Sequence, residues 1–204
     1  PVLVSLIVAS IIIVLGSFIT HGFNRTTSSA VLGMVVTVCG VGVGTIFLMK
    51  ILYLTGVYSE DVVYLIFNTG GNIDTVGLLF AGIMIGLLGI LYDVAIGQAI
   101  AIEELLRADS HMGRKRLMQR GLRIGREHIG ALVNTLAIAY VGASLPLLLL
   151  FATADSGILY ILNREDVSTE IVRILIGSMS IILAVPITTY IAVTILKKYG
   201  IPNK

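Results

Sequence analysis

Residues Gly86–Arg107 read GLLGILYDVAIGQAIAIEELLR, and this stretch decides the class of fold. Its first two-thirds are apolar enough for the middle of a lipid bilayer, yet it carries Asp93 well before the next charged residue, Glu103. A charged side chain at the bilayer centre costs about 2.5–3.5 kcal/mol on insertion scales. We therefore expect Asp93 to face a neighbouring helix rather than lipid.

The composition of the whole chain is that of a membrane protein. Of its 204 residues, 56% are hydrophobic and 13% are charged, and the mean hydropathy is +0.99. A soluble domain is usually about one-quarter charged, and a helical span needs about 20 mostly apolar residues. The segments that meet this length are residues 2–20, 29–54, 76–106, 127–152 and 170–197. The sequence therefore predicts a single all-α domain over residues 1–204, a polytopic transmembrane helical bundle.

The positions of the charged residues predict the orientation of the chain. Lys and Arg gather in a loop of about residues 107–126 and at the C-terminus, whereas Tyr58–Thr75 carries acids and neither Lys nor Arg. By the positive-inside rule, the basic loop and the C-terminus are cytoplasmic. Five spans then place Pro1 outside, so we expect a further N-terminal span and an external region before it. We expect a multi-pass protein of the cytoplasmic (inner) membrane, with no nucleic-acid partner.

Small residues form stripes on two of the predicted helices. Within residues 76–106 they recur every three or four positions, at Gly82, Gly86, Gly89, Asp93 and Gly97. Within residues 29–54 the corresponding stripe is Gly33, Thr37, Gly40 and Gly44. Residues at these spacings share one helix face, and small residues mark helix–helix interfaces in membranes. We therefore expect both stripes to pack against other helices, with these two helices as partners.

Asp93 is the residue best suited to chemistry, and two interpretations stay open. In the first, Asp93 belongs to a proton or ion pathway, together with Gln98 and with Asn134 and Thr135 of the fourth segment as hydrogen-bonding partners. In the second, Asp93 is interhelical glue in a membrane scaffold or accessory subunit. Polar pairs in membranes contribute only about 0.6 kcal/mol on average, so glue is the weaker reason for an aspartate.

The basic loop has an amphipathic pattern. Its sequence RKRLMQRGLRIGREH spans residues 114–128 and places Arg116, Arg120 and Arg123 on one helical face. We expect this segment to lie at the inner membrane interface, where its arginines meet anionic lipid headgroups. Glu103 and Glu104, just before the loop, are expected to be a solvated helix end.

Other chemistries have little support in the sequence. The three histidines, His21, His111 and His128, lie far apart without metal-ligand spacing, and neither GxxxxGK[ST] nor HExxH is present. We therefore expect no catalytic residues, no metal, no cofactor and no enzymatic activity. The expected partners are the lipid bilayer and either another membrane protein or a second copy of the chain.

Three stretches of the sequence carry specific motifs. They are Gly86–Arg107, residues 126–151 (REHIGALVNTLAIAYVGASLPLLLLF) and residues 163–188 (NREDVSTEIVRILIGSMSIILAVPIT). The most specific motifs are G-x-x-x-D-V-A around Asp93 and N-T-L at Asn134–Leu136. On these residues the chain resembles the YibE/F-like family of bacterial multi-spanning membrane proteins. The resemblance implies an additional N-terminal membrane segment and an extracytoplasmic region.

More distantly, the arrangement is similar to one half of a resistance-nodulation-division transporter or of SecD/SecF. That similarity implies one helix, an external domain and then five helices, with a mid-membrane acid that takes part in proton or ion coupling. The chain departs from this pattern because the candidate cations, Arg126 and Arg173, lie toward the membrane edges. Together these observations predict a transporter or permease-like component.

Overall fold

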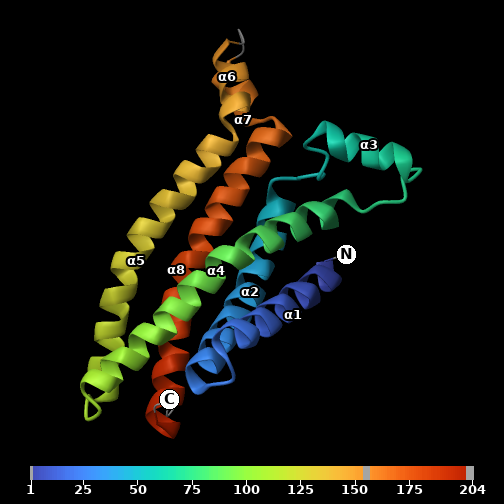
Figure 1. The fold of residues 1–204 in the computed structure, drawn as a ribbon. Helices are drawn as coiled ribbons and strands as arrows, with labels where there is room; N and C mark the ends of the chain where they lie inside the picture. Colours follow the sequence, from blue (N-terminus) through green and yellow to red (C-terminus); the bar gives the residue numbers. More distant parts are fainter. Residues whose placement is uncertain (1, 154–156, 201–204) are drawn as a thin grey trace.

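The computed structural model describes residues 2–153 and 157–200, and in this part of the chain every regular element is a helix. In order they are α1 Val2–His21, α2 Arg25–Ile51, α3 Glu60–Asn68, α4 Thr75–Ala108, α5 Arg114–Ala143, α6 Leu145–Thr153, α7 Ile158–Leu162 and α8 Glu165–Tyr199. The long helices α1, α2, α4, α5 and α8 run alternately in opposite directions (Figure 1). The predicted all-α bundle is confirmed.

Three of the helices, α2, α4 and α8, are long and apolar enough to cross a membrane. Helices α5 and α6 form a fourth span if the pair counts as one, although they meet at a bend of 58°. Helix α1 covers the first predicted span, but the apolar stretch found in its described residues is the shorter Ser10–His21. The predicted number of five spans is therefore approximate, and Pro1 lies outside the described residues.

Helix ends differ from the predicted limits because local caps set them. Helix α2 begins at Arg25 rather than at residue 29, since the side-chain oxygen of Asn24 accepts a hydrogen bond from Thr27 N at 2.7 Å. Asp74 caps α4 in the same way, through Gly77 N at 2.8 Å. Such side chains satisfy backbone donors that have no partner within the helix.

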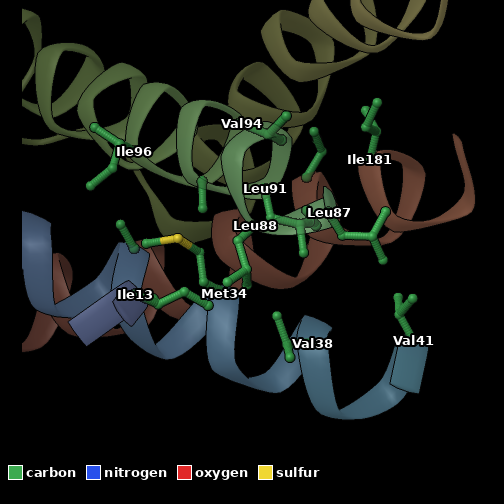
Figure 2. Close-up of a cluster of buried hydrophobic side chains, with 14 of the residues drawn as sticks. Ile13, Met34, Val38, Val41, Leu87, Leu88, Leu91, Val94, Ile96 and Ile181 are labelled. Carbon is green, nitrogen blue, oxygen red and sulfur yellow. The ribbon is translucent and has the colours of Figure 1, made fainter. Parts of the chain in front are cut away.

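The core lies where α2, α4 and α8 meet, and α1 packs against α2 and α4. Figure 2 shows Met34 and Val38 of α2 beside Leu87 and Leu91 of α4, with Ile181 of α8 close by. All of these side chains are almost completely buried. The apolar positions of α4 recur every three or four residues, which gives the helix one continuous packed face.

One end of the bundle, here called the basic end, consists of the α1–α2 turn, the α4–α5 turn and the last turn of α8 (Figure 1). The guanidinium of Arg25 donates to the carbonyl oxygens of Tyr199 and Gly200. Lys197 Nζ donates to the carbonyl of Ser110 at 3.1 Å. The segments predicted to be cytoplasmic are thus held together at the same end.

The opposite end is fastened by Glu165 in the first turn of α8. Its carboxylate accepts hydrogen bonds from Thr55 N at 2.7 Å, Thr55 Oγ1 at 2.7 Å and Gly56 N at 2.6 Å. Gly56 has a φ of +80°, and an added Cβ there would collide with the carbonyl of Thr75. Glycine is therefore required where the loop after α2 passes the start of α4.

The basic segment, which was predicted to belong to a loop of about residues 107–126, forms the first turns of α5, which begins at Arg114. The actual turn between α4 and α5 is short, from Asp109 to Gly113. Gly121 and Gly125 are buried and let this half of α5 approach α4 and α8 closely. The contact of these two glycines with α4 and α8 holds the basic segment against the bundle.

At its other end, α5 ends and α6 begins next to Pro146, which lacks a backbone donor.

Candidate functional site on helix α4

Helix α4 has two different faces. Its bulky face is buried against the rest of the chain and includes Ile83, Leu87, Leu91, Ala95 and Ala99. Its other face carries the predicted stripe, Gly82, Gly86, Gly89, Asp93 and Gly97, and all five residues are exposed in the single chain. From Gly82 to Gly97 this face extends for about 22 Å, at about 1.5 Å per residue.

The expectation that the α4 glycines pack against another helix of the chain is wrong. A Cβ built on Gly82, Gly86, Gly89 or Gly97 would meet nothing within 4 Å. Helices α2 and α4 are partners, as predicted, but α4 contributes its bulky face to the contact. Large side chains bury more apolar area and make more dispersion contacts than glycines do. The bulky face of α4 is therefore the one that packs inside the single chain.

The stripe on α2 is divided. Gly33 lies against α8, where an added Cβ would stand 3.0 Å from the Cα of Thr188, and Thr37 is buried. Gly40 and Gly44 meet nothing within 4 Å, which again differs from the expectation. They border an apolar groove between α2 and α8 that is also lined by Phe47 and Met179.

Asp93 lies on the open face of α4 and makes no hydrogen bond or ion pair within the described part of the chain. The expected hydrogen bond to the fourth predicted segment is absent. Asn134 is exposed on α5, and the hydroxyl of Thr135 donates to the carbonyl of Ala131 at 2.9 Å, inside its own helix. Asp93, Asn134 and Thr135 therefore form no polar cluster in the single chain.

Gln98 is the predicted site residue that does join helices. Its side chain is 4% exposed, and its Nε2 donates to the carbonyl of Gly121 at 2.9 Å and to Thr189 Oγ1 at 2.7 Å. Thr189 in turn donates to the carbonyl of Val185 at 2.6 Å. Gln98 thus connects α4 with α5 and α8 through groups that are buried and satisfied.

A small cavity of about 50 Å³ adjoins Gln98 between α4, α5 and α8. Gly97, Ile124 and His128 also line it. His128 therefore lines the same cavity as Gly97, which lies one helical turn after Asp93 on α4. This proximity could not be read from the spacing of the residues, because His128 and Gly97 are brought together only by the crossing of α4 and α5.

The arginines of the amphipathic segment are exposed, as their shared face predicted. Arg116, Arg120 and Arg123 all point away from the bundle, while Leu117, Gly121 and Gly125 on the other face of α5 are buried. The basic surface is thus available to headgroups, although contact with lipid stays a prediction.

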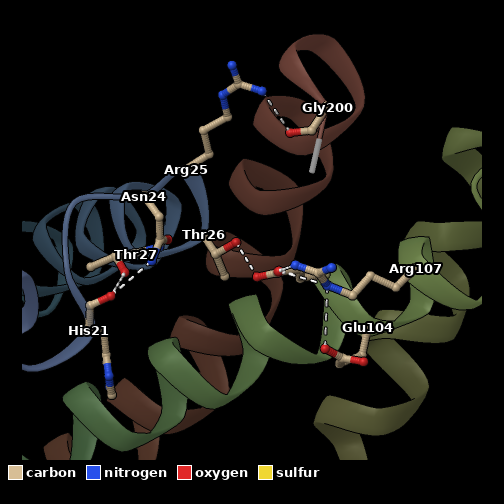
Figure 3. A network of polar contacts seen from close by, with 9 residues as sticks. His21, Asn24, Arg25, Thr26, Thr27, Glu104, Arg107 and Gly200 are labelled. Atoms are coloured by element: carbon tan, nitrogen blue, oxygen red, sulfur yellow. Dashed lines mark hydrogen bonds and ion pairs between the residues drawn. The ribbon is translucent and has the colours of Figure 1, made fainter. Parts of the chain in front are cut away.

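Glu103 lies in a polar network that the sequence did not predict. Its side chain is only 14% exposed; it accepts a hydrogen bond from Thr26 Oγ1 at 2.5 Å and pairs with Arg107 at 2.5 Å. Glu104, the next residue, is 67% exposed and lies 3.7 Å from Arg107. Figure 3 shows His21, Asn24, Thr26 and Thr27 at the α1–α2 turn, with Arg107 and Glu104 on α4 nearby. Only Glu104 matches the expected solvated helix end.

A cavity of about 220 Å³ lies in this network, between the α1–α2 turn and α4. His21, Thr26 and Glu103 are among the residues that line it. In the part of the chain that the structure describes, no group of three or more His, Cys, Asp or Glu side chains could hold a metal ion.

Comparison with known proteins places these features in a family. A family model described as YibE/F-like protein matches residues 1–198, nearly the whole chain. No curated protein and no solved structure matches the chain. The more distant similarity to a half of a resistance-nodulation-division transporter or of SecD/SecF stays a prediction. The apolar helices fit an integral membrane protein, and the chain belongs to the YibE/F-like family.

Proposed function

We propose that this protein is a transporter or permease-like component of the cytoplasmic membrane, coupled to protons or ions through Asp93. The observation that carries the proposal is the position of Asp93 on the outer face of a spanning helix, without a partner in the described part of the chain. Contact with lipid at that depth would cost about 2.5–3.5 kcal/mol for a charged side chain. Water, an ion or another protein surface must therefore meet this carboxyl.

The surroundings of Asp93 favour a helix of another membrane protein chain as the surface that shields Asp93 from lipid. Gly86 and Gly89 leave open space beside Asp93, and small residues allow the backbone of another helix to come close. Either a partner subunit or a second copy of the chain would shield Asp93 from lipid. A carboxyl enclosed in this way changes its charge as its hydration changes, which is what coupling to a proton requires.

The rest of the molecule supports a defined orientation for this unit. The basic end carries Arg116, Arg120 and Arg123 on an exposed face, where they can bind anionic headgroups. By the positive-inside rule, this end and the C-terminus lie in the cytoplasm. Gln98 fixes the adjoining part of α4 to α5 and α8.

A second candidate function is that of a membrane scaffold or accessory subunit. The open glycine face of α4 favours it, because a long face of small residues serves partner binding equally well. Asp93 would then hydrogen-bond to the partner and would stay in one protonation state.

Proton flux into proteoliposomes separates the two functions. The chain, purified with whatever copurifies from its membrane, is reconstituted with pyranine inside, and a pH gradient is applied. Asp93→Asn should fold with an unchanged melting temperature, because no bond is lost within the chain, and should abolish the flux. Asp109→Asn, at the end of α4, is the matched control and should retain it. A folded Asp93→Asn protein with unchanged flux, and with unchanged function in cells, would remove ion coupling at this site.

A further inference from the structure

Helix α3 is the element that the rest of the bundle leaves largely uncovered. Of its nine residues, all of which the structure describes, only Val62 is buried, and α3 makes at most weak contacts with the other described helices. Figure 1 shows α3 apart from the long helices, beyond the ends of α2 and α4. Isolated helices shorter than about 12–15 residues are marginal in water. Another surface is therefore needed to stabilise α3.

The sequence of α3, EDVVYLIFN, is amphipathic. Its apolar side chains share one side of the helix, and its charged and amide side chains share the other. The apolar side consists of Val62, Val63, Leu65, Ile66 and Phe67, and the polar side of Glu60, Asp61 and Asn68. Phe67 is 77% exposed, and Val63, one turn before it, is exposed as well. Tyr64, at the boundary between the two sides, is also exposed.

The loop that carries α3 is fastened at its base. Thr75 Oγ1 donates to the carbonyl of Thr55 at 2.6 Å, which joins the end of the loop to its start. The carboxylate of Glu165 holds the same part of the loop from α8, through the backbone and the hydroxyl of Thr55. The place at which α3 leaves the bundle is therefore defined by hydrogen bonds.

This base lies at the edge of the surface that two spanning helices offer to lipid. Both α2 and α4 are long and apolar enough to cross a membrane. Ile51 and Leu52, at the end of α2, are exposed, and so is Val76 in the first turn of α4. Tyr53, the next residue after Leu52, is exposed too, and tyrosine is enriched at membrane–water interfaces. The apolar side of α3 thus continues the apolar surface of α2 and α4 at its edge.

We propose that α3 lies in the headgroup region of the bilayer, at the end of the bundle opposite the basic end. Phe67 and Val63 insert among the acyl chains, and the acidic side of the helix faces water. A helix with aliphatic and aromatic residues on one side binds such an interface through its buried apolar area. Because α3 contains neither Lys nor Arg, apolar contact rather than attraction to anionic headgroups holds it there.

Bound in this way, α3 would anchor the amino end of α4. Interfacial anchors set the tilt of spanning helices, and α3 is followed by only a short turn before Asp74 caps α4. This role belongs to the loop between α2 and α4 and does not depend on transport through Asp93.

The test uses tryptophan fluorescence, because the chain contains no tryptophan and an introduced one reports only its own surroundings. Phe67→Trp places the indole on the apolar side of α3, and Asp61→Trp, the matched control, places it on the polar side. Each full-length variant is reconstituted in phosphatidylcholine nanodiscs with or without brominated acyl chains. Acrylamide is the aqueous quencher, because it is neutral and the acidic residues of α3 do not repel it.

Phe67→Trp should lose most of its emission in brominated lipid and little with acrylamide, because an interfacial helix buries its apolar face about 5–10 Å into the headgroup and acyl boundary. Asp61→Trp should show the reverse. A rise in salt concentration should leave the quenching by brominated lipid unchanged, since no basic residue of α3 takes part.

Equal quenching of the two variants by brominated lipid would contradict the proposal, and so would free access of acrylamide to Phe67→Trp. If neither quencher reaches Phe67→Trp, protein rather than lipid covers α3, and the proposal is likewise wrong. If Phe67→Trp does not fold, Val63→Trp replaces it, one turn earlier on the same side. Val63→Trp should also lose most of its emission in brominated lipid, and an unquenched Val63→Trp would equally overturn the lipid contact.

Discussion

Gln98 Nε2 donates a hydrogen bond to the main-chain carbonyl of Gly121 at 2.9 Å, which joins the middle of α4 to the basic half of α5. The contact depends on the absence of a side chain at the next turn of α5, because a Cβ on Gly125 would stand 2.8 Å from Oε1 of Gln98. A polar side chain on α4 and two glycines on α5 thus act as one unit, and the basic segment becomes part of the bundle.

The first prediction concerns this bond. Gln98→Leu should lower the free energy of unfolding by about 1–3 kcal/mol, because the buried carbonyl of Gly121 would lose its donor. Gln119→Leu makes the same chemical change at an exposed position of α5 and should have little effect. Denaturant titration of both variants in mixed micelles checks the difference. Equal losses of stability in the two variants would contradict the role given to Gln98.

The second prediction compares two glycines of the stripes. Gly33→Ala should destabilise the chain by about 1–3 kcal/mol through overpacking, since its Cβ would press on the backbone of Thr188 in α8. Gly89→Ala should leave the melting temperature unchanged or raise it, because its Cβ meets open space and alanine favours helix by about 1 kcal/mol. Thermal unfolding of the isolated chain measures both. A loss of stability in Gly89→Ala would show that α4 packs with its glycine face.

The third prediction concerns assembly. Gly89→Leu should leave folding of the isolated chain intact, because the site is open, but should prevent a second membrane helix from approaching Asp93. The measurement is the size of the complex extracted from membranes in mild detergent, with Val43→Leu, exposed on α2, as the control. A complex of unchanged size would contradict the packing of a second membrane helix on the glycine face beside Asp93.

Hydropathy predicted the helices because each long apolar run must satisfy its backbone internally, whatever it packs against. Which face of α4 packs against the core of the chain could not be predicted in the same way. Its two faces carry equally regular patterns, large residues such as Leu87 and Leu91 on one and Gly86 and Gly89 on the other. Periodicity shows that both faces exist, but only the tertiary packing shows which one meets the chain's own core.

In the candidate site, too, local features could be predicted from the sequence and long-range contacts could not. Asp93 is identifiable because a single acid interrupts an apolar run, and that is a local property of the sequence. The contact of Glu103 with Thr26 joins residues 77 positions apart, and the bond from Gln98 to Thr189 joins residues 91 apart. Pairings over such separations depend on how helices cross, so residue types and spacing alone do not contain them.

The fourth prediction concerns the end of the bundle opposite the basic end. Glu165→Ala should release the loop after α2, because the carboxylate accepts three hydrogen bonds from Thr55 and Gly56. Hydrogen exchange at the amides of Thr55 and Gly56 should become faster, and each charge-assisted bond lost should cost about 1.5–3 kcal/mol at most. Asp166→Ala is the control, since its carboxylate pairs with Arg164 instead. Unchanged exchange at both amides would show that the loop is held by other contacts.

The fifth prediction concerns orientation in the membrane. Lys115 and Lys198 are exposed at the basic end, and Asp61 is exposed in α3 at the other end. In a Cys39→Ala background, a membrane-impermeant maleimide should label Asp61→Cys in intact cells, and should label Lys115→Cys and Lys198→Cys only after permeabilisation. Labelling of both lysine positions from outside would invert the orientation but keep the fold. Labelling of only one of them would contradict the bundle itself, because Arg25 and Lys197 hold the α1–α2 turn, the α4–α5 turn and the end of α8 on one side.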